Sequence, residues 1–211
     1  MIRRIEDYIR GVIQLKLETL GISFDELCDT PPEFNEEALR DPMKYKSYRA
    51  FISLKETYKN PVSLAILYLL EQQYSYKVLE MYAHDLVAGQ PAWEQGISGR
   101  DIDYIIVLEK LPPRELIDAI ENYLDNLVGS AITNYFFKKK GCTTLEPYNK
   151  VIKHNLVELH AILPNMKNSY GINSSVFSVP VERLDLKGLR KRIMELRQSI
   201  EKLGFLEDYM H

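Results

Sequence analysis

The segment "DIDYIIVLEK" at residues 101–110 restricts the fold of this chain more than any other stretch. After two aspartates it runs through five consecutive apolar or aromatic residues, 104–108, and "LPP" follows the segment. A continuous apolar run of this length, bounded by charge and proline, is typical of a β-strand that is buried on both faces. The chain is therefore expected to build a sheet around this strand, with Asp101 and Asp103 at its start.

Amphipathic helices are expected on both sides of this strand. Over residues 2–20 the apolar positions recur every three or four residues and the pattern ends at Gly21, which favours a helix with a left-handed glycine cap. Ser23 and Glu26 have the spacing of a short capping box. The other helices are predicted over residues 43–59, 61–83, 114–140 and 186–203.

Three other segments have strand character. "HDLVAGQ" (84–90) is short, lacks helical periodicity and runs into a glycine turn, and "NLVELHAIL" (155–163) ends before Pro164. "SSVFSVPV" (174–181) is a candidate for a further strand, and residues 144–154 fit no single pattern. Strands in the middle and helices outside them indicate an α+β fold with a small mixed sheet, flanked by N- and C-terminal helices.

This order of elements suggests three regions. Residues 1–60 are expected to form an N-terminal helical region, residues 61–182 the core with the sheet, and residues 183–211 a C-terminal helix. The flanking helices are candidate docking surfaces for a partner protein or for a second copy of the chain.

Composition excludes several classes of protein. With 27 Lys and Arg against 30 Asp and Glu, the net charge of −3 argues against a generally basic coat for nucleic acid. Cys28 and Cys142 form neither a disulfide framework nor a zinc pattern. No apolar stretch approaches the roughly 20 residues of a membrane helix, and the N-terminus has no apolar signal core, so a cytoplasmic protein without a membrane segment is expected.

The aspartate pair is the strongest candidate for chemistry. Side chains two apart on a strand point to the same face, so Asp101 and Asp103 are expected side by side. Glu158 is the one acidic residue of the later strand-like segment, and it completes a cluster of three carboxylates if the two strands are neighbours. Carboxylate oxygens are the ligands that magnesium prefers, so the sequence predicts a magnesium site.

Two segments together resemble the nucleotidyltransferase superfamily, the group that includes DNA polymerase β and the minimal nucleotidyltransferases. Members have a strand ending in glycine, a loop of about ten residues, an Asp-x-Asp that opens a second strand, a helix, and a third acidic residue on a third strand. "LVAGQPAWEQGISGRDIDYIIVLEK" (86–110) matches the first part of this pattern and "NLVELHAIL" the last. The resemblance covers roughly residues 80–165 and implies a sheet of nucleotidyltransferase type.

The resemblance also implies an activity. Asp101, Asp103 and Glu158 would be the catalytic carboxylates and would hold two Mg²⁺ ions, with Glu158 also helping to deprotonate the attacking hydroxyl. The reaction would transfer a nucleoside monophosphate from an NTP to a hydroxyl of a protein, an RNA or a small molecule, and would release pyrophosphate. The metal ions would stabilise the attacking and leaving oxygens.

The nucleotide itself would bind at the glycine turn. Gly89 would let the phosphates approach the backbone, with Gln90 and Arg100 beside them. Gln90 stands where family members have serine or a second glycine, so its bulky amide would either crowd the triphosphate or bond to it differently. A catalytically inactive relative that acts as a binding or regulatory module is therefore the alternative. His160 is two residues after Glu158 on the same strand face, which places it where it could approach the site, but an ordinary polar or packed histidine is the favoured expectation.

Overall fold

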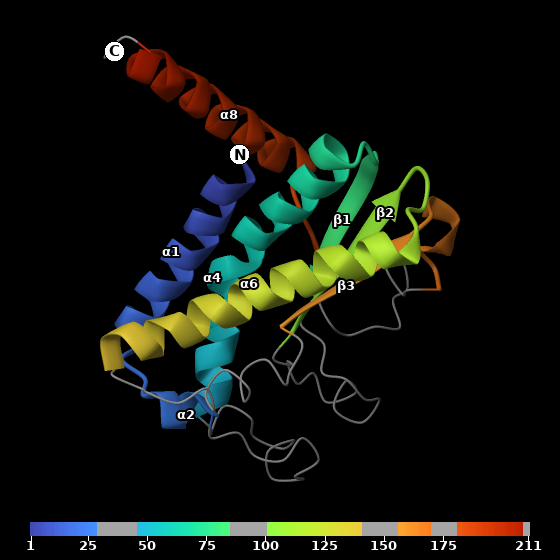
Figure 1. Cartoon of the computed structure of the whole chain (residues 1–211). Helices are drawn as coiled ribbons and strands as arrows, with labels where there is room; N and C mark the ends of the chain where they lie inside the picture. The colour runs from blue at the N-terminus through green and yellow to red at the C-terminus, as the bar shows by residue number, and fades with distance from the viewer. Residues whose placement is uncertain (29–45, 85–100, 141–155, 170–180, 209–211) are drawn as a thin grey trace.

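The computed structural model describes residues 1–28, 46–84, 101–140, 156–169 and 181–208. It confirms an α+β fold with a small mixed sheet, and Figure 1 shows α6 crossing in front of the strands with α4 and α1 beside it. The elements are α1 (Ile2–Leu20), α2 (Phe24–Cys28), α4 (Lys46–Leu67), a π-helical segment (Tyr68–Gln73), β1 (Val78–His84), β2 (Ile102–Leu108), α6 (Arg114–Lys140), β3 (Val157–Ile162), a 3₁₀ turn (Pro164–Met166), β4 (Glu182–Arg183) and α8 (Leu186–Asp208).

The sheet has the strand order β3-β2-β1-β4. β1 pairs antiparallel with both β2 and β4, whereas β2 and β3 are parallel. A parallel pair needs a long crossover, and α6 lies between β2 and β3 in the chain, as this connection requires. β2 and β3 therefore begin at the same end of the sheet.

Alternation along β2 separates two apolar clusters. Ile102, Tyr104 and Ile106 belong to the main core, which they share with buried side chains of α1, α4 and α6. Ile105 and Val107 belong to a smaller cluster on the opposite face, together with other side chains of the sheet. Every residue of β2 is buried, as the apolar run predicted.

The first helix and its cap also follow the sequence. α1 buries one stripe of isoleucine and leucine and ends at Gly21, which has a φ of 60° and donates its N–H to the Leu17 carbonyl over 3.2 Å. The Glu26 N–H donates to Ser23 Oγ over 3.1 Å, and the Ser23 N–H donates to Glu26 Oε2 over 3.0 Å. This reciprocal pair is the expected capping box, at the start of α2.

The expected helix boundary at Pro61 is wrong, because α4 continues through this proline. A proline removes one backbone hydrogen bond from a helix and usually ends or kinks it. Close to the proline, the Lys59 carbonyl accepts the hydroxyl of Ser63, one turn later in α4, at 2.7 Å and that of Tyr104, from β2, at 3.0 Å. The boundary expected between the N-terminal helical region and the core, at residues 60 and 61, thus falls inside α4.

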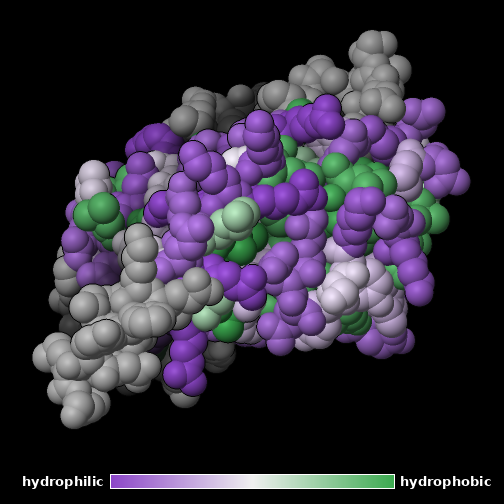
Figure 2. Space-filling view, turned by 90° about the horizontal axis from the view of Figure 1, so that it is seen from above, coloured by the Kyte–Doolittle hydropathy of each residue, from purple (hydrophilic) through white to green (hydrophobic). Residues whose placement is uncertain are grey.

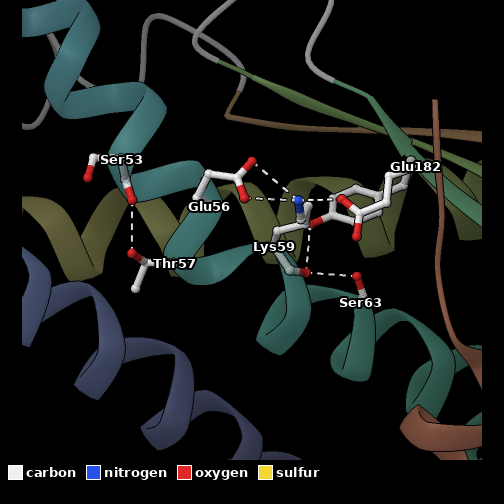
Figure 3. A network of polar contacts seen from close by, with 7 residues as sticks. Ser53, Glu56, Thr57, Lys59, Ser63 and Glu182 are labelled. Carbon is white, nitrogen blue, oxygen red and sulfur yellow. Dashed lines mark hydrogen bonds and ion pairs between the residues drawn. The ribbon is translucent and has the colours of Figure 1, made fainter. Parts of the chain in front are cut away.

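The Lys59 side chain ties the same part of α4 to the sheet. Figure 3 shows its amine between Glu56, one turn earlier on α4, and Glu182 of β4. The distances from Nζ are 3.1 Å to Glu56 and 2.5 Å to Glu182. Burial alone would lower the pKa of Lys59, but the two carboxylates outweigh it and raise that pKa, so the amine stays charged.

The helix expected over 61–83 is wrong in its second half. The π-helical segment ends at Gln73, Ser75 takes a left-handed φ of 59°, and β1 begins at Val78 rather than at residue 84. Val78, Met81 and Tyr82 have helix-like spacing, but β1 lies inside the sheet and pairs on both edges. Inter-strand hydrogen bonding therefore overrides the local pattern.

The remaining elements agree closely with expectation. α6 has the predicted bounds, with Gly129 inside it, and α8 begins at the predicted Leu186 and runs to Asp208. Glu71 anchors α8, because its carboxylate accepts both Arg190 Nε and Nη2 and also the Val78 N–H. The segments 84–90, apart from His84, 144–154 and 174–180 lie outside the described residues.

The face of the molecule seen from above (Figure 2) is mainly polar where its residues are described. Figure 2 shows hydrophilic residues over most of the face seen from above, with hydrophobic ones exposed between them. No helix in the described part of the chain combines the length and apolar character that crossing a bilayer requires.

Candidate metal centre

Asp103 and Glu158 occupy paired positions on the parallel strands β2 and β3. Each is the second residue of its strand, so both lie at the same end of the sheet. One carboxylate oxygen of each residue and one ring nitrogen of His160 all lie within 4.8 Å of one another. The two strands are thus neighbours, which is the condition the sequence set for Glu158 to join Asp103.

This cluster lies on the sheet face opposite the helices. By alternation, Asp103 shares its face with Ile105 and Val107, and Glu158 and His160 share theirs with Ile162. The Asp103 side chain is only 10% exposed, whereas the Glu158 side chain is 40% exposed. A ligand approaching this face would therefore meet Glu158 before Asp103.

His160 belongs to the cluster, contrary to the expectation of an ordinary histidine. Its Nε2 lies 3.4 Å from Asp103 Oδ1 and 3.6 Å from Glu158 Oε1. The sequence carried the signal, since His160 is two residues after Glu158 on one strand. What it lacked was the register of β2 and β3, which brings Asp103 to the same point.

The charges of the cluster act on each other. Burial and then the Asp103 charge raise the pKa of Glu158, while His160 works in the opposite direction. The contact with Asp103 raises the pKa of His160. Without a bound cation, protonation of His160 thus relieves the repulsion between the two carboxylates.

Asp101 lies just before β2 and is not a member of this cluster. Burial, followed by the charge of Asp103, raises the pKa of Asp101 to about 7. Lys55 of α4 is fully buried, and its positive charge acts on Asp101 in the opposite direction. The aspartate pair is therefore close enough to interact, although only Asp103 meets Glu158 directly.

Two carboxylates of α6, which sequence reasoning missed, hold the backbone on both sides of Glu158. Asp125 Oδ1 accepts the Leu156 N–H over 2.5 Å, and Glu121 Oε2 accepts the Leu159 N–H over 2.8 Å. Leu156 comes directly before β3, and β3 is the edge strand of the sheet in the part of the chain that the structure describes, so the two carboxylates bond its backbone where no described strand does. In the sequence, Glu121 and Asp125 look like the polar side of an amphipathic helix and give no sign of this role.

The expected nucleotide-binding residues Gly89, Gln90 and Arg100 lie outside the described residues. β1 and β2 place the two ends of this segment next to each other, because His84 pairs with Asp103. The segment that carries the three residues thus leaves and re-enters the sheet at the end where Asp103 lies.

The donors present suit a divalent cation. Carboxylate oxygens are the protein ligands that magnesium takes, and they fit the expected ion. The imidazole of His160 is not a typical magnesium ligand but suits first-row transition metals. Asp103, Glu158 and His160 could therefore hold one cation, with Asp101 nearby to balance further positive charge.

Comparison of the chain with protein-family models, curated proteins and solved structures found no match.

Proposed function

We propose that this protein is a metal-dependent nucleotidyltransferase that moves a nucleoside monophosphate from an NTP to a hydroxyl group. The observation that supports this most is the pairing of Asp103 and Glu158 on adjacent parallel strands. It brings the second aspartate of the Asp-x-Asp pattern together with the later acidic residue. The order of β2, α6 and β3 is also the order of elements that the resemblance implied.

The residues have separate roles in this proposal. Asp103 and Glu158 would hold the cation, and Asp101 would complete the negative charge that neutralises a second one. The metal would supply electrostatic stabilisation of the attacking and leaving oxygens. Glu158 is the more exposed carboxylate of the cluster, so it would accept the proton of the attacking hydroxyl. Gly89, Gln90 and Arg100 would bind the phosphates, and the flanking helices would select a protein, RNA or small-molecule acceptor.

The first test is ligand binding. We expect Mg²⁺ together with one of the four NTPs to stabilise the protein by about 2.7 kcal/mol at a hundredfold excess over the dissociation constant. Asp103→Asn should remove this stabilisation. Glu109→Gln, just past the opposite end of β2 and exposed, is the matched control and should keep it. Equal stabilisation of wild type and Asp103→Asn would contradict the proposed ligand set.

The second test is transfer. Incubation with NTPs labelled in the α-phosphate and a cell lysate should label an acceptor in the presence of wild-type protein and Glu109→Gln, but not of Asp103→Asn. An inactive binding module is the second candidate, and the bulky Gln90 in the place of a small residue favours it. NTP binding without labelling of any acceptor would support that second function.

A further inference from the structure

We propose that His160 Nε2 is a direct ligand of the cation held by Asp103 and Glu158, and that the site therefore prefers a first-row transition-metal dication, such as Zn²⁺ or Mn²⁺, to Mg²⁺. This inference uses the metal site of the proposed function but does not depend on nucleotidyl transfer. Its basis is the position of the imidazole, which the resemblance to nucleotidyltransferases does not include.

The distances between the donor atoms are the first argument. His160 Nε2 lies 3.4 Å from Asp103 Oδ1 and 3.6 Å from Glu158 Oε1. A well-formed hydrogen bond from nitrogen to oxygen spans about 2.7–3.2 Å, so both contacts are long for one. A tetrahedral cation with ligand bonds of about 2.0–2.2 Å holds neighbouring ligand atoms about 3.3–3.6 Å apart. Both separations from His160 Nε2 fall in this second range, and the two carboxylate oxygens lie within 4.8 Å of each other.

The chemistry of the donors is the second argument. Magnesium takes oxygen ligands in near-ideal octahedral geometry and usually keeps several of its waters. Zinc accepts imidazole and carboxylate together, and a site with three protein ligands leaves a fourth position for water or substrate. Asp103, Glu158 and His160 offer two carboxylates and one imidazole from two rigid strands. This donor set fits a transition metal better than magnesium.

The surroundings of His160 favour a ring that stays in place. It lies between Asp103 of β2 and Glu158 of β3, and Glu121 of α6 acts on it electrostatically from the helix that covers the strand edge. Glu121 also holds the Leu159 N–H, next to His160 in the chain. Three carboxylates from three elements thus create a negative environment that a dication would neutralise more fully than a singly charged imidazolium.

The test uses the full chain without nucleotide. The protein is freed of metal by a chelator and titrated with Mn²⁺, Zn²⁺ and Mg²⁺ by calorimetry. We expect at least about 10-fold tighter binding of Mn²⁺ and Zn²⁺ than of Mg²⁺. His160→Gln should lower the affinity for Mn²⁺ and Zn²⁺ by about 10-fold or more and leave Mg²⁺ binding nearly unchanged. Glu109→Gln is the charge control and should bind all three ions as wild type does.

A spectroscopic measurement on the wild-type protein does not depend on how the variants fold. Pulsed electron paramagnetic resonance of bound Mn²⁺ should detect coupling to an imidazole nitrogen, and this signal should be absent in His160→Gln. Bound Mn²⁺ without nitrogen coupling, equal affinities for Mn²⁺ and Mg²⁺, or no metal binding would each overturn the inference. Nitrogen coupling together with a failure of every NTP to bind would instead support the inference and count against the proposed function.

Discussion

Asp103 and Glu158 face each other across two parallel strands, and β2, α6 and β3 together bring them to one point. If both carboxylates bind one cation, their contributions to metal affinity are coupled, because removing either carboxylate already disrupts the site. We expect Asp103→Asn and Glu158→Gln each to lower the metal affinity by about 10-fold or more. The double variant should bind metal only slightly less tightly than whichever single variant has the lower affinity. Calorimetric titration of all four proteins measures this coupling.

Independent effects of the two substitutions would contradict a shared cation. The same titrations of Glu109→Gln combined with each substitution provide the reference, since Glu109 is exposed and pairs with Lys77 at the other end of β2. In these control pairs, the effects of the two substitutions on the free energy of metal binding should add.

Asp101 should make the metal-free protein less stable as pH rises. Its pKa is about 7 in the folded protein, whereas an aspartate in an unfolded chain has a pKa near 3.8, so between about pH 4 and 7 the unfolded chain loses this proton first. Stability from the neutral carboxyl is therefore complete below pH 4 and is lost as the pH rises through about 7. Asp101→Asn cannot ionise and so avoids this loss. After allowance for the partial exposure of Asp101, we expect the free energy of unfolding of the variant at pH 8 to be higher than that of wild type by on the order of 1–2 kcal/mol.

Denaturant unfolding in the presence of a chelator at pH 4, 6 and 8 measures this effect. Wild type and Asp101→Asn should differ least at pH 4 and most at pH 8. If the difference in the free energy of unfolding between the two proteins were the same at all three pH values, the ionisation of Asp101 would not be its cause.

Asp125 and Glu121 should stabilise the edge of the sheet at β3. Asp125→Ala leaves the Leu156 N–H without its partner, and Glu121→Ala does the same to the Leu159 N–H. An unsatisfied buried donor costs about 1–3 kcal/mol, so each substitution should lower the free energy of unfolding by that amount. Asp118→Ala, on the same helix and more than half exposed, should cost less than about 0.5 kcal/mol.

Hydrogen exchange locates this effect. Faster exchange of the Leu156 amide in Asp125→Ala and of the Leu159 amide in Glu121→Ala is expected. Unchanged exchange at both amides would mean that these carboxylates do not hold the strand.

Lys59 should tolerate the loss of either carboxylate partner but not of both. Glu56 and Glu182 each lie beside its amine, and both are more than half exposed, so Glu56→Gln or Glu182→Gln alone should cost less than about 1 kcal/mol. The double variant leaves a largely buried amine without a carboxylate and should cost more than the sum of the two. Thermal unfolding of the four proteins tests this, and simple additivity would argue against a shared amine.

The sequence alone determined the elements whose cause is local. The apolar run of β2, the periodicity of α6 from Arg114 to Lys140 and the glycine cap of α1 all act over a few residues, and the structure has them as expected. The sequence also indicated Asp103 and Glu158 as partners on the condition that their strands are neighbours, and the parallel pairing of β2 and β3 meets this condition.

Only the tertiary structure decided where β1 begins, that α4 passes through Pro61, and that His160 joins the cluster. β1 has helix-like spacing and becomes a strand because β2 and β4 supply hydrogen bonds on its two edges. α4 continues through Pro61, and Tyr104, a distant residue of β2, bonds the Lys59 carbonyl two residues before this proline. His160 meets Asp103 through the register of β2 and β3. Each of these contacts joins residues far apart in the chain, so the local pattern could suggest a candidate such as His160 but could not establish the contact.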